Sequence, residues 1–119
     1  MKCKIDLVNP ILIDGKKCKT LTYDFQEITP QGYMDMEKFL DISDADFMMN
    51  PTWLMGVTMA AIIAVNSNIE FIDLMRIKGS DVITMSKLGR NFTWLAEEGL
   101  PAKTSDDVQE NMQDTSAQA

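Results

Sequence analysis

The sequence contains no histidine, so it lacks the side chain that most often serves as a general base or a metal ligand. Its two cysteines, Cys3 and Cys18, are too far apart for a CxxC or zinc-ligand pattern. A calcium loop is also missing, because Asp41, Asp44 and Asp46 lack the residue order, turn glycine and closing glutamate of that motif. We therefore predict no catalytic residue, no cofactor and no metal site.

Basic charge is scarce as well. Lysine and arginine number 11 against 18 aspartates and glutamates, which gives a net charge of −7. Nucleic-acid binders neutralise phosphates with basic side chains, so this balance argues against a nucleic-acid partner. The charge is also uneven. Residues 1–20 carry five lysines and two acids, whereas residues 97–119 carry six acids and one lysine.

No apolar run is long enough for a membrane span, which needs about 20 residues. The longest such stretch, Trp53–Val65, is interrupted only by Gly56 and Thr58, and polar residues follow it at once. We expect a buried helix here, with Asn50 as its N-cap and Pro51 as its first residue. Because the helix is apolar almost all round, we expect a neighbouring helix, a second copy or a client to cover part of it.

The remaining pattern predicts an α+β fold. Residues 4–8 alternate as in a short strand, and residues 11–25 form a β-hairpin around Asp14-Gly15, a strong turn signal. Caps and apolar periodicity predict helices at about 30–41, 51–66, 68–77 and 80–98, with Thr29, a Ser67-to-Glu70 capping box and Ser80 at three of their starts.

We therefore predict a single domain over residues 1–100. In it a small N-terminal antiparallel β-hairpin or sheet, with strands within 2–25, packs on a bundle of three to four helices. Residues 101–119 are polar and acidic, and we expect a disordered acidic tail. The first ten residues lack the apolar region of a signal peptide, so a cytosolic location is the expectation.

Ten methionines are a further feature of the sequence. Methionine is flexible and polarizable, and it is common on surfaces that bind varied apolar helices. Four of the ten gather with two aromatic residues around Asn50, where they form either a groove for a client helix or part of the core. The predicted client-binding residues are Phe47, Met48, Met49, Trp53, Met55 and Met59.

Two runs carry a family resemblance. PILIDGK at Pro10–Lys16 and TLTYDFQEITPQGYMDMEKF at Thr20–Phe39 resemble the start of a family of phage tail assembly chaperones. Ile28-Thr29-Pro30 stands for the family's helix entry, Glu37 for a glutamate of its first helix, and residues 91–95 for its closing aromatic-leucine segment. The chain departs from the family in having Ile28 where leucine is usual and in a methionine-rich middle helix.

The resemblance implies a non-enzymatic factor in the cytoplasm of the bacterial host. Such a protein binds and solubilises the tape measure protein, helps recruit subunits of the major tail (tube) protein and leaves before the virion is complete. Self-association is a further expectation, and a membrane partner is not expected.

Two alternatives to the chaperone remain open. The first is a structural tail or head–tail connector subunit that stays in the virion, with its apolar helix buried against identical copies. The second is a regulatory protein that binds a host factor through the lysines of the hairpin.

Overall fold

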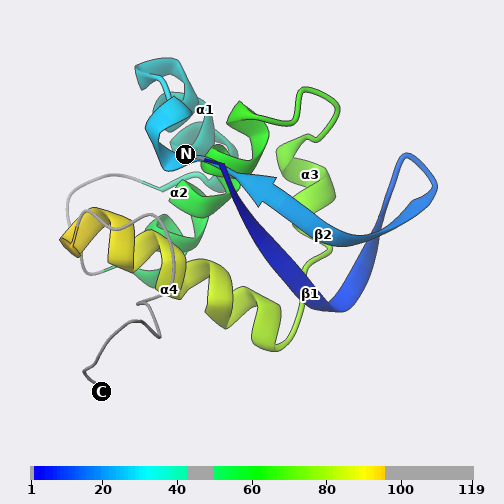
Figure 1. The fold of residues 1–119 in the computed structure, drawn as a ribbon. Helices are drawn as coiled ribbons and strands as arrows, with labels where there is room; N and C mark the ends of the chain where they lie inside the picture. Colours follow the sequence, from blue (N-terminus) through cyan, green and yellow to red (C-terminus); the bar gives the residue numbers. More distant parts are fainter. Residues whose placement is uncertain (1, 43–49, 96–119) are drawn as a thin grey trace.

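The computed structural model describes residues 2–42 and 50–95, and it confirms the predicted α+β class. A two-stranded antiparallel sheet precedes a short 3₁₀ turn and four α-helices (Figure 1). The elements are β1 Cys3–Ile13, β2 Lys16–Tyr23, the 3₁₀ helix η1 Phe25–Glu27, α1 Pro30–Leu40, α2 Pro51–Ala64, α3 Phe71–Leu74 and α4 Ser80–Leu95. The predicted acidic tail, residues 101–119, and the predicted end of the last helix lie outside the described residues.

The hairpin forms at the predicted turn. Asp14 and Gly15 have φ angles of 53° and 77°, the pair of positive values that a type I′ hairpin turn requires. Figure 1 shows the hairpin at one side of the helices, with this turn projecting outward. The strand predicted at residues 4–8 is confirmed, but it is continuous with the first hairpin strand: β1 runs through to Ile13, and its register shifts between Asp6 and Ile11.

A buried carboxylate holds the irregular part of β1. The backbone N–H groups of Val8 and Asn9 donate to the two carboxylate oxygens of Asp81, each at 2.9 Å. Asp81 lies in the first turn of α4 and is only 2% exposed. Hydrogen bonds to a charged acceptor are among the stronger ones in proteins, so this pair joins the sheet firmly to the last helix.

Helix α2 forms the centre of the domain. It begins after Asn50, whose side-chain oxygen accepts a hydrogen bond from the N–H of Thr52 at 2.9 Å, as predicted for an N-cap. Nine residues of α2 are buried, and the helix contacts β2, η1 and the other three helices. Of the three covers expected for this helix, the structure shows the first, because neighbouring helices of the same chain pack on it. In the described part of the chain no helix is long and apolar enough to cross a membrane.

Two glycines allow the neighbouring helices to approach α2 closely. A Cβ atom at Gly89 of α4 would lie 1.9 Å from the carbonyl oxygen of Leu54. A Cβ atom at Gly56 of α2 would lie 2.6 Å from the sulfur of Met36 on α1. Thr58 adds a hydrogen bond across the α2–α4 contact, because its hydroxyl donates to the carbonyl oxygen of Met85 at 2.6 Å. The crossing between α2 and α4 is therefore a backbone-to-backbone contact.

Helix α3 is shorter than predicted and starts later. The predicted capping box beginning at Ser67 is wrong, because the box joins Glu70 and Asp73 instead. The side-chain amide of Asn66 donates to the carbonyl oxygens of Thr22 and Ile62 at 2.9 and 2.7 Å, and these bonds favour a turn before the helix.

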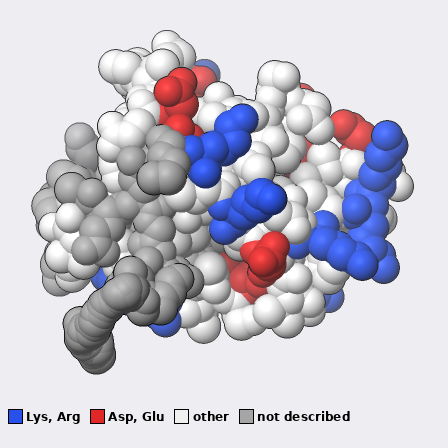
Figure 2. Space-filling model, in the orientation of Figure 1, with Lys and Arg blue, Asp and Glu red and all other residues white. Residues whose placement is uncertain are grey.

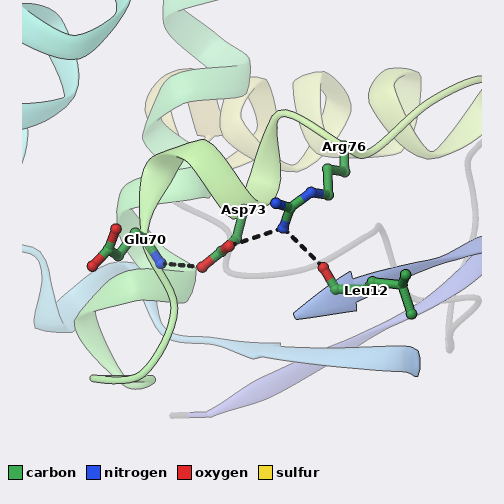
Figure 3. A network of polar contacts seen from close by, with 4 residues as sticks. All are labelled: Leu12, Glu70, Asp73 and Arg76. Atoms are coloured by element: carbon green, nitrogen blue, oxygen red, sulfur yellow. Dashed lines mark hydrogen bonds and ion pairs between the residues drawn. The ribbon is translucent and has the colours of Figure 1, made fainter. Parts of the chain in front are cut away.

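A polar network ties α3 to the sheet (Figure 3). The N–H of Glu70 donates to Asp73 at 3.0 Å, and Asp73 accepts a second hydrogen bond from Arg76 at 2.9 Å. The same Arg76 nitrogen donates to the carbonyl oxygen of Leu12 at 2.9 Å. These contacts fix the position of α3 beside the end of β1.

Candidate functional site

Three of the six predicted client-binding residues lie in the described part of the chain. Phe47, Met48 and Met49 lie outside the described residues. Met59 is 1% exposed and Trp53 is 7% exposed, and Met55 is partly buried. Of the two roles that the sequence left open, burial favours the core role for Met59 and Trp53. The client contact predicted for these two residues is corrected accordingly.

The tryptophan instead joins α2 to α1. Its indole N–H donates to the Oε2 of Glu37 at 2.9 Å, and its ring stacks on Tyr33 with centroids 6.2 Å apart. Partial burial raises the pKa of the Tyr33 hydroxyl above its usual value. Glu37, which stands for the family glutamate in the resemblance, therefore makes a structural contact in this fold.

An apolar groove lies between α1 and α3, and we call it the α1–α3 groove. Its main hollow has a volume of about 590 Å³. The exposed side chains of Phe39 and Ile72 stand at its walls, and the ring of Phe71 stacks on Phe39 with a centroid distance of 5.3 Å. The residues that line this hollow are Asp35, Lys38, Phe39, Ile63, Ile69, Glu70, Phe71 and Ile72.

A second hollow of about 300 Å³ continues the groove. The two hollows share Asp35, Ile63 and Phe71, so they form one recess. Small residues at the end of α2, Ala60 and Ala64, line the second hollow and leave room beside Phe71. The groove thus extends along the space between the two helices.

Acidic side chains surround the groove. Glu27, Asp35 and Glu70 line its two hollows, and Lys38 is the one basic residue among the residues lining them. Gln31 donates to one oxygen of Asp35 at 2.7 Å, which holds this carboxylate at the rim. An apolar recess with an acidic border suits a binding surface, because it offers apolar contact area together with charge selectivity.

The α1–α3 groove was not predicted from the sequence. No local pattern indicates that Phe71 stacks on Phe39. The signal present in the sequence was the pair Phe71-Ile72 directly after the cap at Glu70, where two large apolar side chains begin a very short helix.

A second recess lies under the hairpin turn but has a different character. Its volume is about 580 Å³, and Asp14, Asp73, Arg76 and Lys78 line it beside Leu12. Charges of both signs line this recess, and Arg76 already bonds to Asp73 and Leu12 (Figure 3). Its lining is therefore more polar than that of the α1–α3 groove, although Pro10 and Ile11 also contribute to it.

Basic side chains gather over the hairpin, as Figure 2 shows. Lys16, Lys17 and Lys19 of β2 are all exposed, and none of them forms an ion pair within the described part of the chain. The hairpin is thus a basic region on an acidic protein.

No family model, curated protein or solved structure matches this chain. Within residues 2–42 and 50–95, no group of three or more histidine, cysteine or acidic side chains is placed to hold a metal ion. The α1–α3 groove is the feature from which we infer a function.

Proposed function

We propose that this protein is a non-enzymatic tail assembly chaperone of a long-tailed phage or prophage. In this proposal it binds and solubilises the tape measure protein in the bacterial cytoplasm and helps recruit subunits of the tail tube protein. The observation that carries the proposal is the α1–α3 groove, an apolar recess on a domain whose own long apolar helix is already buried. The sequence resemblance supplies the family.

The groove supports this role because the client is a long helical protein. Apolar stripes of a helix bind in hydrophobic grooves between helices, where side chains at i, i+3, i+4 and i+7 act as anchors. Phe39 and Ile72 are 40% and 56% exposed and offer apolar contact area at the groove walls. Several copies along one client would bind it by avidity, so each contact can be weak.

The net charge of −7 also supports the chaperone role. A chaperone that covers an apolar client must keep the complex soluble, and a net charge far from zero opposes aggregation. The exposed apolar side chains of the groove thus belong to a chain whose net charge opposes aggregation.

Co-expression tests this proposal. The full chain would be produced with the product of the long, helix-rich reading frame expected downstream of it, and soluble client and co-purification would be measured. We expect the client to become soluble and to co-purify with the tagged chain. A client that stays insoluble and does not co-purify would refute the proposal.

A structural subunit is the second candidate, because apolar side chains are also exposed on α4. Ile83 and Leu95 are 62% and 58% exposed, so a second copy in an assembled tail would bury them favourably. Mass spectrometry of purified virions separates the two functions. The chaperone should be absent from the finished particle, whereas a structural subunit should be present in many copies.

A further inference from the structure

We infer that the α1–α3 groove binds an amphipathic helix whose apolar stripe is bordered by lysine or arginine side chains. This inference rests on the proposed function for the helical nature of the client, and it adds the chemistry that the groove selects. Three observations support it: the apolar walls, the helical backbone on both sides, and the acidic rim.

The walls provide large apolar side chains at the surface. Phe39 and Ile72 are exposed although each contacts the recess, and Phe71 stacks beside them. The two hollows share part of their lining, so the recess is elongated rather than a single round pocket. An elongated apolar recess fits successive anchors along one face of a helix.

The backbone around the groove favours a helical ligand over an extended one. An extended peptide binds by adding to a sheet edge, where unpaired N–H and C=O groups are free. Here one wall is α1, and in the other wall Leu74 and Met75 donate their N–H groups to the carbonyl oxygens of Glu70 and Phe71. Side-chain contacts must therefore provide the binding, as in a helix-in-groove complex.

The rim sets the charge of the partner. Glu27, Asp35 and Glu70 oppose only Lys38, so the lining carries three negative charges and one positive charge, a net of −2. A helix bordered by acidic residues would be repelled at this rim, whereas one bordered by basic residues would be attracted. The same argument disfavours an anionic membrane surface as the occupant.

Synthetic peptides test the selectivity directly. The probes are three labelled helical peptides of about 20 residues, long enough to form helix in isolation. One has a leucine stripe bordered by lysine, one has the same stripe bordered by glutamate, and one has the lysine composition in scrambled order. We expect the first to bind the full chain about tenfold tighter than the second in low salt, with the ratio falling as salt is added. The scrambled peptide should not bind.

Two pairs of variants locate the site. Ile72→Ser should weaken binding of the lysine-bordered peptide about tenfold, because an exposed isoleucine loses its burial against the ligand. Ile83→Ser on α4 is the matched control, since Ile83 is 62% exposed against 56% for Ile72 but lies outside the groove lining, and this variant should bind normally.

The charge pair is Asp35→Asn with Asp6→Asn as control. Both aspartates are exposed and each accepts one side-chain hydrogen bond, from Gln31 and from Thr20 respectively. Asp35→Asn should weaken binding about threefold in low salt, and Asp6→Asn should not change it. Circular dichroism confirms that each variant is folded.

A further variant blocks the groove instead of removing a side chain from it. Ala64→Gln adds bulk from an exposed position in the second hollow without removing any packed side chain, so it should also weaken binding. Equal affinity for the lysine-bordered and glutamate-bordered peptides would overturn the inference. So would normal binding by Ile72→Ser and Ala64→Gln, or a dimer of this chain that occupies the groove and excludes the peptide.

The outcome for the groove is separable from the outcome for the proposed function. If Ile72→Ser binds the lysine-bordered peptide as the wild type does while the tape measure protein co-purifies with the wild-type chain, the groove assignment is wrong but the chaperone function stands. If the lysine-bordered peptide binds the groove while the tape measure protein does not co-purify, the chaperone function is wrong and the groove assignment stands.

Discussion

Replacing Gly89 with alanine should destabilise the domain more than any other glycine-to-alanine change within its helices. The added Cβ would lie 1.9 Å from the carbonyl oxygen of Leu54 and 2.8 Å from its carbonyl carbon. Both are backbone atoms of α2, so no side-chain rotation can relieve the overlap. The two helices would have to move apart, and the 2.6 Å hydrogen bond from Thr58 to Met85 would lengthen with them.

The magnitude follows from two opposing terms. Overpacking a well-packed contact costs about 1–3 kcal/mol, and a backbone obstacle places Gly89→Ala at the upper end of that range. Alanine recovers about 1 kcal/mol over glycine through helix propensity. The net loss in the free energy of unfolding is therefore about 2 kcal/mol, which corresponds to a fall in Tm of about 10 °C for a domain of this size.

Urea unfolding followed by circular dichroism measures this loss, and two further glycines provide controls. At Gly56 the Cβ would meet the side-chain atoms of Met36 and Leu40 at 2.6–2.8 Å, so Gly56→Ala should cost less than Gly89→Ala. At Gly32 the nearest atom is Cγ2 of Ile28 at 3.2 Å, and Gly32→Ala should be close to neutral. If Gly89→Ala were as stable as the wild type, the close α2–α4 crossing would be incorrect.

Three further changes have effects that the structure predicts. Asp81→Ala leaves the N–H groups of Val8 and Asn9 without their acceptor, so it should lower the free energy of unfolding by about 2–3 kcal/mol. Urea unfolding measures this loss. A loss of less than about 0.5 kcal/mol, as for an ordinary surface change, would contradict the anchoring role. Asn50→Ala removes the cap of α2 and should cost about 1 kcal/mol by the same assay, whereas Asn50→Gly should cost only a few tenths. Burial raises the pKa of Tyr33 in the folded state, so its stabilising contribution is complete below the unfolded pKa of about 10 and falls as pH rises above it. Tyr33→Phe should therefore lose stability less steeply in alkaline solution than the wild type, and parallel slopes would contradict the burial of this hydroxyl.

Locally determined features of this fold could be predicted from the sequence. The turn at Asp14-Gly15 and the helix starts at Thr29 and Asn50 each depend on residues within a few positions of one another. A positive φ favours glycine, and a side-chain oxygen at the N-cap accepts from the first free N–H groups, whatever the rest of the chain does.

Features that depend on distant residues could not be predicted in this way. The irregular stretch of β1 is held by Asp81, which lies more than 70 positions later in the sequence. The late start of α3 depends on hydrogen bonds from Asn66, one of which reaches across to the sheet. Neither partner carries a local signal, because an aspartate in the first turn of a helix and an asparagine in a turn are both ordinary.

The candidate site shows the same limit. An all-round apolar pattern predicts that α2 is covered but does not tell which element covers it, so the sequence left Met59 between groove and core. The structure places it at 1% exposure because the other helices, η1 and β2 surround α2. The α1–α3 groove depends on the stacking of Phe39 and Phe71, which are 32 positions apart and meet only after the chain has folded.

The location of the groove separates the stability of the domain from binding. The core side chains of α2 are withdrawn from solvent, so a partner cannot reach them without unfolding the domain, whereas Phe39 and Ile72 are reachable and contribute little to the core. Under the proposed function this arrangement has a consequence for release. Each client contact is partly exposed and bordered by screened surface charge, so a single copy binds weakly and dissociates fast. Subunits of the tail tube protein, which would bury the client more completely, can then displace the copies of the chaperone one at a time. The fold of the chaperone need not change.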